Sequence, residues 1–117
     1  MLKSTHRLST KQFMDVMKSG RIYTSPLFGA RIVFGSSQTG KSLIISAVAP
    51  KKVASTAVLR SKTRRRIYKA VIHSNIYATY TKSAQIIICA KNEMIPTTQE
   101  MVDADMVLLF KKIGLSV

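Results

Sequence analysis

The chain has 117 residues, of which 46% are hydrophobic, and its formal net charge is +14 at pH 7. This length suits a single domain over residues 1–117, and the hydrophobic content excludes a disordered basic tail. Only five Asp and Glu residues occur in the chain. Residues 16–92 contain no Asp or Glu but fourteen Lys and Arg. Residues 16–92 therefore cannot form the carboxylate site with which many nucleases and phosphotransferases hold Mg²⁺. Phosphodiester chemistry in this basic part of the chain needs a metal site supplied by another molecule.

A first helix is expected over about residues 10–19. Ser9 and Gln12 form a capping box at its start, and Gly20 supplies the stop. Its apolar face consists of Phe13, Val16 and Met17.

Three strands are expected next. Ile22–Ser25 is short and is stopped by Pro26. Leu27–Phe34 alternates with the period of two that is typical of a strand, and Leu43–Ala49 is β-branched and apolar. The turn-rich residues between these last two segments suggest an antiparallel pair joined by a polar loop.

That loop, Gly35–Ser42, matches the phosphate-loop pattern GxxxxGK[ST]. The pattern binds phosphate only where a helix begins at its Lys-Ser pair, because the N–H groups of the helix receive the anion. Here Leu43–Val48 is more typical of a strand, and no apolar strand ends in the Asp that would complete a Mg²⁺ site. We therefore expect a hairpin loop and no nucleotide cofactor.

A second helix, over roughly Ala57–Asn75, belongs to the most basic part of the chain. Apolar residues at helical spacing allow one side to be buried while the other holds a dense cationic face. Such a face repels itself unless a polyanion neutralises it, which points to nucleic acid, since solvated surfaces usually mix the two signs. The eight cations of this region, with no acid among them, are Lys51, Lys52, Arg60, Lys62, Arg64, Arg65, Arg66 and Lys69.

The chain ends with a buried strand and a third helix, which gives the order αβββαβα. Gln85–Ala90 is the strand, and its Cys89 suits a small buried residue in a reducing cytoplasm. Thr97 and Glu100 form a second capping box, and Gly114 closes the helix. Its apolar stripe consists of Val102, Met106, Leu109 and Ile113.

Other candidates are weaker. His6 and His73 have no carboxylate or cysteine at metal-site or triad spacing, so both are expected to be structural or solvated, and no protein metal site is expected. Tyr77 and Tyr80 fit base stacking and packing against the sheet equally well.

The basic segment resembles a known family. Lys51–Val53 and Ala57–Ile67 are similar to the signature helix of bacterial ribonuclease P protein subunits, whose pattern is K-K-V…A-V-x-R-N-R-x-[KR]-R. The resemblance runs from about Arg7 to Lys112. It includes the first helix (Arg7–Gly20), the last strand (Gln85–Lys91) and the final helix (Glu100–Met106).

This resemblance implies an α/β (α+β) two-layer sandwich like the second domain of a small-subunit ribosomal protein, with a left-handed βαβ crossover that carries the basic helix. It also implies a protein subunit that joins a catalytic RNA and helps it remove the 5′ leader from precursor tRNA. The RNA would then hold the catalytic Mg²⁺. A basic RNA-binding structural protein of ribosomal type is the alternative.

The resemblance further implies two sets of site residues. The eight cations and Ser61 would contact the RNA subunit. Phe13, Met17 and Arg31 would line a cleft for the leader between the first helix, the sheet and the basic helix. The family usually has Asn and Arg at Ser61 and Lys62, and aromatic residues at Met17 and Arg31. Lys62 lacks the planar fork of Arg, which grips phosphate bidentately.

Overall fold

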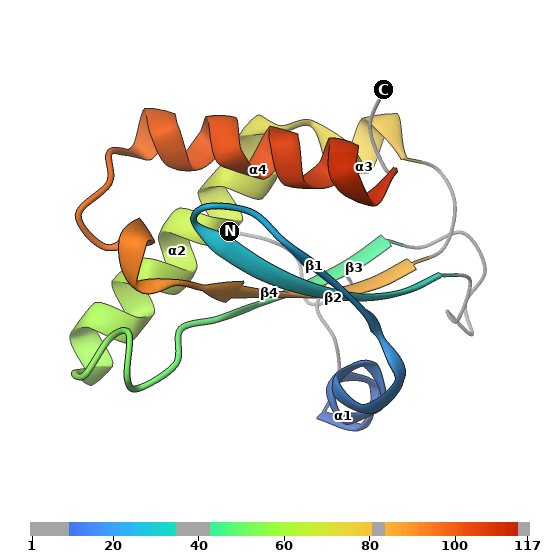
Figure 1. The fold of residues 1–117 in the computed structure, drawn as a ribbon, viewed down its shortest axis with the longest axis horizontal. Coiled ribbons are helices and arrows are strands. Elements are labelled where there is room, and N and C mark those ends of the chain that lie inside the picture. Colours follow the sequence, from blue (N-terminus) through green and yellow to red (C-terminus); the bar gives the residue numbers. More distant parts are fainter. Residues whose placement is uncertain (1–9, 35–42, 81–83, 115–117) are drawn as a thin grey trace.

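The structure, a computed structural model, describes residues 10–34, 43–80 and 84–114, which form a four-stranded mixed sheet with helices on both faces (Figure 1). The elements follow the predicted order, with two additional short helices, α3 and η2. Their bounds are α1 Thr10–Ser19, β1 Arg21–Thr24, β2 Phe28–Phe34, β3 Leu43–Val48, α2 Ala57–His73, α3 Ile76–Thr79, β4 Ala84–Ala90, η2 Asn92–Met94 and α4 Gln99–Ile113. Within the described ranges, no helix is long and apolar enough to cross a membrane. Ser9 and Gly35–Ser42 lie outside the described residues.

The main hydrophobic core lies between the sheet and a layer formed by α2 and α4, as the predicted sandwich requires (Figure 1). Alternate residues of β2 face this core, namely Phe28, Ala30 and Ile32. The predicted apolar stripe of α4 is buried against it. Helix α1 lies on the opposite face of the sheet, where it contacts β2 and β4 and buries Val16 completely.

The pairing of the strands corrects the sequence-based prediction. β2 and β3 are not neighbours, because β4 lies between them and the sheet order is β1-β2-β4-β3. β4 pairs antiparallel with β2 and parallel with β3, so the predicted hairpin of β2 and β3 is wrong. Ile86 and Ile87 point to opposite faces of β4 and are both fully buried, which is the pattern of a central strand covered on both faces. Because parallel strands need a crossover connection, α2 runs between β3 and β4.

The start of α4 also differs by one residue from the prediction. Thr98, and not Thr97, is the N-cap, and its Oγ1 accepts a hydrogen bond from the backbone N–H of Met101. The hydroxyl of Thr97 instead donates to the carbonyl of Glu93 at 2.6 Å. The helix ends at Gly114 as predicted, with a φ of 92° that lies in the left-handed region favouring glycine.

Gly20 fixes how closely α1 approaches the sheet. Its N–H donates to the carbonyl of Val16 at 2.8 Å and so ends the helix. A Cβ at this position would meet that same carbonyl oxygen at 2.5 Å and the backbone nitrogen of Ile32 at 3.2 Å. Any larger residue would therefore push α1 away from β2.

A buried carboxylate ties α4 to the turn between β1 and β2. Oδ2 of Asp105 accepts hydrogen bonds from Oγ of Ser25 at 2.6 Å and from the N–H of Leu27 at 3.1 Å. Both Ser25 and Asp105 are buried, so these donors replace the water that the carboxylate loses on folding. The contact joins residues 80 positions apart in the sequence.

Candidate nucleic-acid interface

Helix α2 presents cations on the side that faces away from the core. It starts after Thr56, whose Oγ1 accepts a hydrogen bond from the N–H of Leu59 at 3.1 Å. The buried residues of the helix recur at helical spacing and are Thr63, Ile67, Ala70 and Val71. Away from this stripe, three basic side chains are exposed, namely Lys62, Arg65 and Lys69. The expected cationic face is therefore present at these positions.

The loop before α2 adds two more exposed cations, Lys51 and Lys52. Arg60 is half-buried and folds back onto this loop, since its Nη1 donates to the carbonyls of Ala54 at 3.2 Å and Ser55 at 3.3 Å. Arg60 was expected to project outward like its neighbours. In the structure it also holds the cationic loop against the start of the helix.

Ser61 and Arg64 interact along the helix surface. Nη2 of Arg64 donates to Oγ of Ser61 at 3.2 Å, and both residues are half-buried. Ser61 occupies the position where the resembling family has Asn, and its hydroxyl here acts as an acceptor that orients the neighbouring guanidinium.

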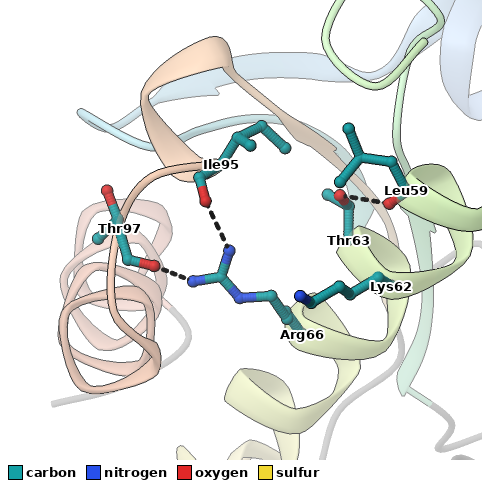
Figure 2. Close-up of a pocket in the computed structure, with 6 residues that line it drawn as sticks. All are labelled: Leu59, Lys62, Thr63, Arg66, Ile95 and Thr97. Carbon is teal, nitrogen blue, oxygen red and sulfur yellow. Dashed lines mark hydrogen bonds between the residues drawn. The ribbon is translucent and has the colours of Figure 1, made fainter. Parts of the chain in front are cut away.

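Arg66 does not follow the expectation of an outward cation. Its Nη1 donates to the carbonyls of Met94 at 3.2 Å and Ile95 at 3.3 Å, and its Nη2 donates to the carbonyl of Thr97. Figure 2 shows the bonds to Ile95 and Thr97. The fixed fork of a guanidinium allows it to bind several carbonyls at once. Arg66 therefore attaches α2 to the segment 94–97, which leads into α4.

A pocket of about 330 Å³ lies between α2 and this segment (Figure 2). The α2 residues that line it are spaced i, i+3, i+4 and i+7, so they form one stripe along the helix. The residues across from this stripe belong to a connecting segment with no periodic signal, and only the structure identifies them. The pocket is lined by Leu59, Lys62, Thr63 and Arg66 of α2 and by Ile95 and Thr97.

The three residues expected to bind the leader lie on the α1 side of the sheet. Phe13 is half-buried, and Met17, one helical turn later, is 36% exposed. Nη1 of Arg31 donates to the backbone carbonyl of Met17 at 2.7 Å. This places a positive charge at the C-terminal end of α1, where the carbonyls carry partial negative charge. The structure thus brings Met17 and Arg31 into direct contact and puts Phe13 on the same helix.

The surface around Arg31 is open. Ile22 lies directly opposite Arg31 on β1 and is 63% exposed. A Cβ at Gly29 would have no atom within 4 Å. Cys89, opposite Gly29 on β4, is half-buried and not fully buried as expected. Burial raises the pKa of the Cys89 thiol, and the nearby charge of Arg31 opposes that rise.

The remaining candidates have structural roles. Nδ1 of His73 and Oδ2 of Asp103 lie 2.6 Å apart and join α2 to α4. Tyr77 and Tyr80 pack against the core, and burial raises the pKa of both hydroxyls, which favours packing over base stacking. His6 lies outside the described residues.

Comparison with known proteins identifies the family. A family model described as Ribonuclease P matches residues 2–114. The RNase P protein of Staphylococcus aureus has a similar structure, with a TM-score of 0.76 and 15% identity over 98% of this chain and 100% of that chain. The RNase P protein from Thermotoga maritima gives a TM-score of 0.75 and 15% identity over 91% of this chain and 96% of that chain. No curated protein matches. The structural likeness establishes the fold, and the family model spans nearly the whole sequence, so the chain belongs to the ribonuclease P protein family.

Proposed function

We propose that this ribonuclease P protein subunit binds a catalytic RNA through the cationic surface of α2 and its preceding loop, and that the RNA cleaves the 5′ leader from precursor tRNA. The observation that carries this proposal is the set of exposed cations on one helix and its N-terminal loop: Lys51, Lys52, Lys62, Arg65 and Lys69. Binding RNA releases the counterions condensed on its phosphates, which supplies much of the affinity of such surfaces.

Magnesium ions belong to the RNA in this proposal. Residues 16–92 contain no carboxylate, and this range includes the whole of α2 and the sheet strands β1, β2, β3 and β4. Mg²⁺ prefers carboxylate, phosphate and water oxygens. RNA phosphates can supply these ligands, whereas the cationic surface of the protein repels a divalent cation. The role of the protein is then to neutralise phosphates and to hold the substrate, and a reducing cytoplasm suits its single cysteine.

A reconstitution experiment tests the proposal. Mixing the protein with a bacterial-type ribonuclease P RNA and precursor tRNA at low Mg²⁺ is expected to raise the rate of 5′ cleavage by about tenfold or more, because protein cations replace Mg²⁺ in offsetting repulsion between two RNAs. The rate of leader release is measured on gels with labelled precursor. Tight RNA binding without faster cleavage would instead support the structural protein of ribosomal type.

We further propose that Phe13, Met17 and Arg31 contact the single-stranded leader on the surface beside α1. Aromatic side chains stack on any base, so a partner of variable sequence is accepted. Arg31 keeps its positive charge at the end of α1, where it can attract phosphate or stack through its guanidinium plane. The exposed Ile22 and the open surface at Gly29 leave room for a strand of RNA next to these residues.

Substitutions at this site are expected to affect precursor and mature tRNA differently. Phe13→Leu and Arg31→Ala should each weaken binding of precursor tRNA to the holoenzyme about tenfold, in line with the loss of one stacking contact, and leave mature tRNA unaffected. Binding of the two tRNAs is measured in parallel by filter retention.

Two matched variants control for damage to α1. Arg31→Lys keeps a donor for the Met17 carbonyl, and Met14→Leu changes a residue of the same helix that is 55% exposed. Met14→Leu should bind both tRNAs like the wild type. An equal loss of affinity for precursor and mature tRNA in the Phe13 and Arg31 variants would show that these side chains only support the fold.

A further inference from the structure

We propose that the pocket between α2 and the segment 94–97 receives one unstacked nucleobase of an RNA strand that lies along α2. This inference rests on the proposed function, because it assumes that RNA phosphates follow the cations of α2. It goes beyond that function, since a purely electrostatic surface needs no pocket for a base. The volume of about 330 Å³ lies at the low end of the roughly 300–1,000 Å³ typical of small-molecule sites.

The walls of the pocket suit a flat aromatic ring. The side chains of Leu59 and Ile95 point into it from opposite sides (Figure 2). Arg66 directs its Nη1 and Nη2 donors to backbone carbonyls, so the part of the guanidinium best able to meet a ligand is its planar face. A guanidinium plane stacks on nucleobases in RNA recognition. The site therefore offers a stacking partner and two apolar contacts.

Lys62 supplies the contact for phosphate. Its ammonium group lies beside Arg66 at the pocket (Figure 2) and its side chain is exposed. Lys69 is seven residues further on the same helix, two turns or about 10 Å along the axis. An RNA backbone running from Lys62 to Lys69 would pass the mouth of the pocket. An unstacked nucleotide at this point can turn its base inward.

Hydrogen bonds fix the shape of the pocket without a ligand. The N–H of Thr97 donates to the carbonyl of Met94 at 3.1 Å, and Nε2 of Gln99 donates to the carbonyl of Arg66 at 3.1 Å. The same Nε2 lies 2.8 Å from Oδ1 of Asp103. Since both walls are held in place, binding a base costs little ordering of the protein.

The test compares two fluorescent single-stranded probes of equal charge, an RNA octamer of uridines and an octamer with the same ribose-phosphate backbone but no bases. The full chain is tested with Phe13→Leu throughout, so that the site beside α1 adds no aromatic stacking. It is expected to bind the uridine octamer about tenfold more tightly, a preference typical of one stacked base. Ile95→Trp fills the pocket with an indole and should abolish this preference while leaving affinity for the abasic probe and its salt dependence unchanged. Leu108→Trp, at a position of α4 that is 57% exposed, adds the same indole elsewhere and should retain the preference.

A photo-crosslink locates the base without any substitution. An octamer that carries 4-thiouridine is irradiated with the wild-type protein, and mass spectrometry is expected to find adducts on residues 59–66 or 94–97 in addition to any adducts at the site beside α1. Adducts confined to α1 and the sheet, or a preference for bases that survives Ile95→Trp, would overturn the pocket proposal. Equal, salt-dependent binding of the two probes would overturn the pocket proposal but would still support RNA binding by the cationic surface. Failure of both probes to bind would overturn the cationic surface as well.

Discussion

Alanine at Lys62, Arg65 and Lys69 together is expected to weaken binding to ribonuclease P RNA by about a hundredfold at 0.1 M salt. All three side chains are exposed on α2, so their removal leaves the core and the hydrogen bonds of Arg60 and Arg66 in place. Each lost phosphate contact should reduce the slope of log K against log salt by roughly 0.7 to 0.9. The equilibrium constant is measured over a salt series, and circular dichroism checks the fold.

A second triple variant separates the effect of removing cations from α2 from the effect of lowering the net charge of the protein. Lys18, Arg21 and Lys111 are also exposed, belong to other elements, and change the charge by the same amount when replaced by alanine. This variant should bind slightly less tightly, with a salt slope close to that of the wild type. Equal slopes in the two triple variants would show that RNA contacts are spread over the whole protein surface and are not concentrated on α2.

Asp105→Ala is expected to lower the free energy of unfolding by about 2–4 kcal/mol, because it leaves the N–H of Leu27 without its acceptor and the buried hydroxyl of Ser25 with only the carbonyl of Phe28, at 3.5 Å, as an acceptor. The loss should loosen the β1–β2 turn from α4. Urea denaturation followed by circular dichroism measures the change in unfolding free energy.

Asp103→Ala is the matched control on the same helix. Its carboxylate meets His73 at the surface, where the exposed fractions of the His and Asp side chains are 45% and 27%. Solvent screens such a pair, so this substitution should cost about 1 kcal/mol or less. Similar losses in the two variants would mean that Asp105 contributes no more than a surface carboxylate does.

Short-range signals in the sequence determined the three long helices, but not the short helices α3 and η2. The predicted first helix, residues 10–19, has the bounds of α1, and the predicted second helix starts where α2 starts, at Ala57. Periodicity and capping act within one or two turns of chain, so they can be recognised without the fold. The cationic character of α2 follows from the same helical period, whereas the family was indicated by the resemblance of the motifs at Lys51–Val53 and Ala57–Ile67.

The order of the strands was decided by tertiary structure. An alternation of period two shows which residues of a strand share a face, but it does not show which strand lies next to it. β2 and β3 follow each other in the chain and each has an apolar face, so a hairpin was the natural expectation. The strand β4 is apolar on both faces, so it buries more apolar surface between β2 and β3 than it would at an edge of the sheet. This burial depends on the helices that cover both sides of the sheet.

The direction of long polar side chains was likewise decided by the fold. In the sequence Arg66 is one more cation of a basic helix, yet its guanidinium binds carbonyls up to 31 residues away and so forms one wall of a pocket. Asp105 is one of five acids, and its partner Ser25 is 80 residues distant. Such contacts depend on how elements far apart in the chain pack together. The sequence by itself therefore determined the three long helices, the charge of α2 and the family, whereas only packing decided which cations face solvent and which hold the fold.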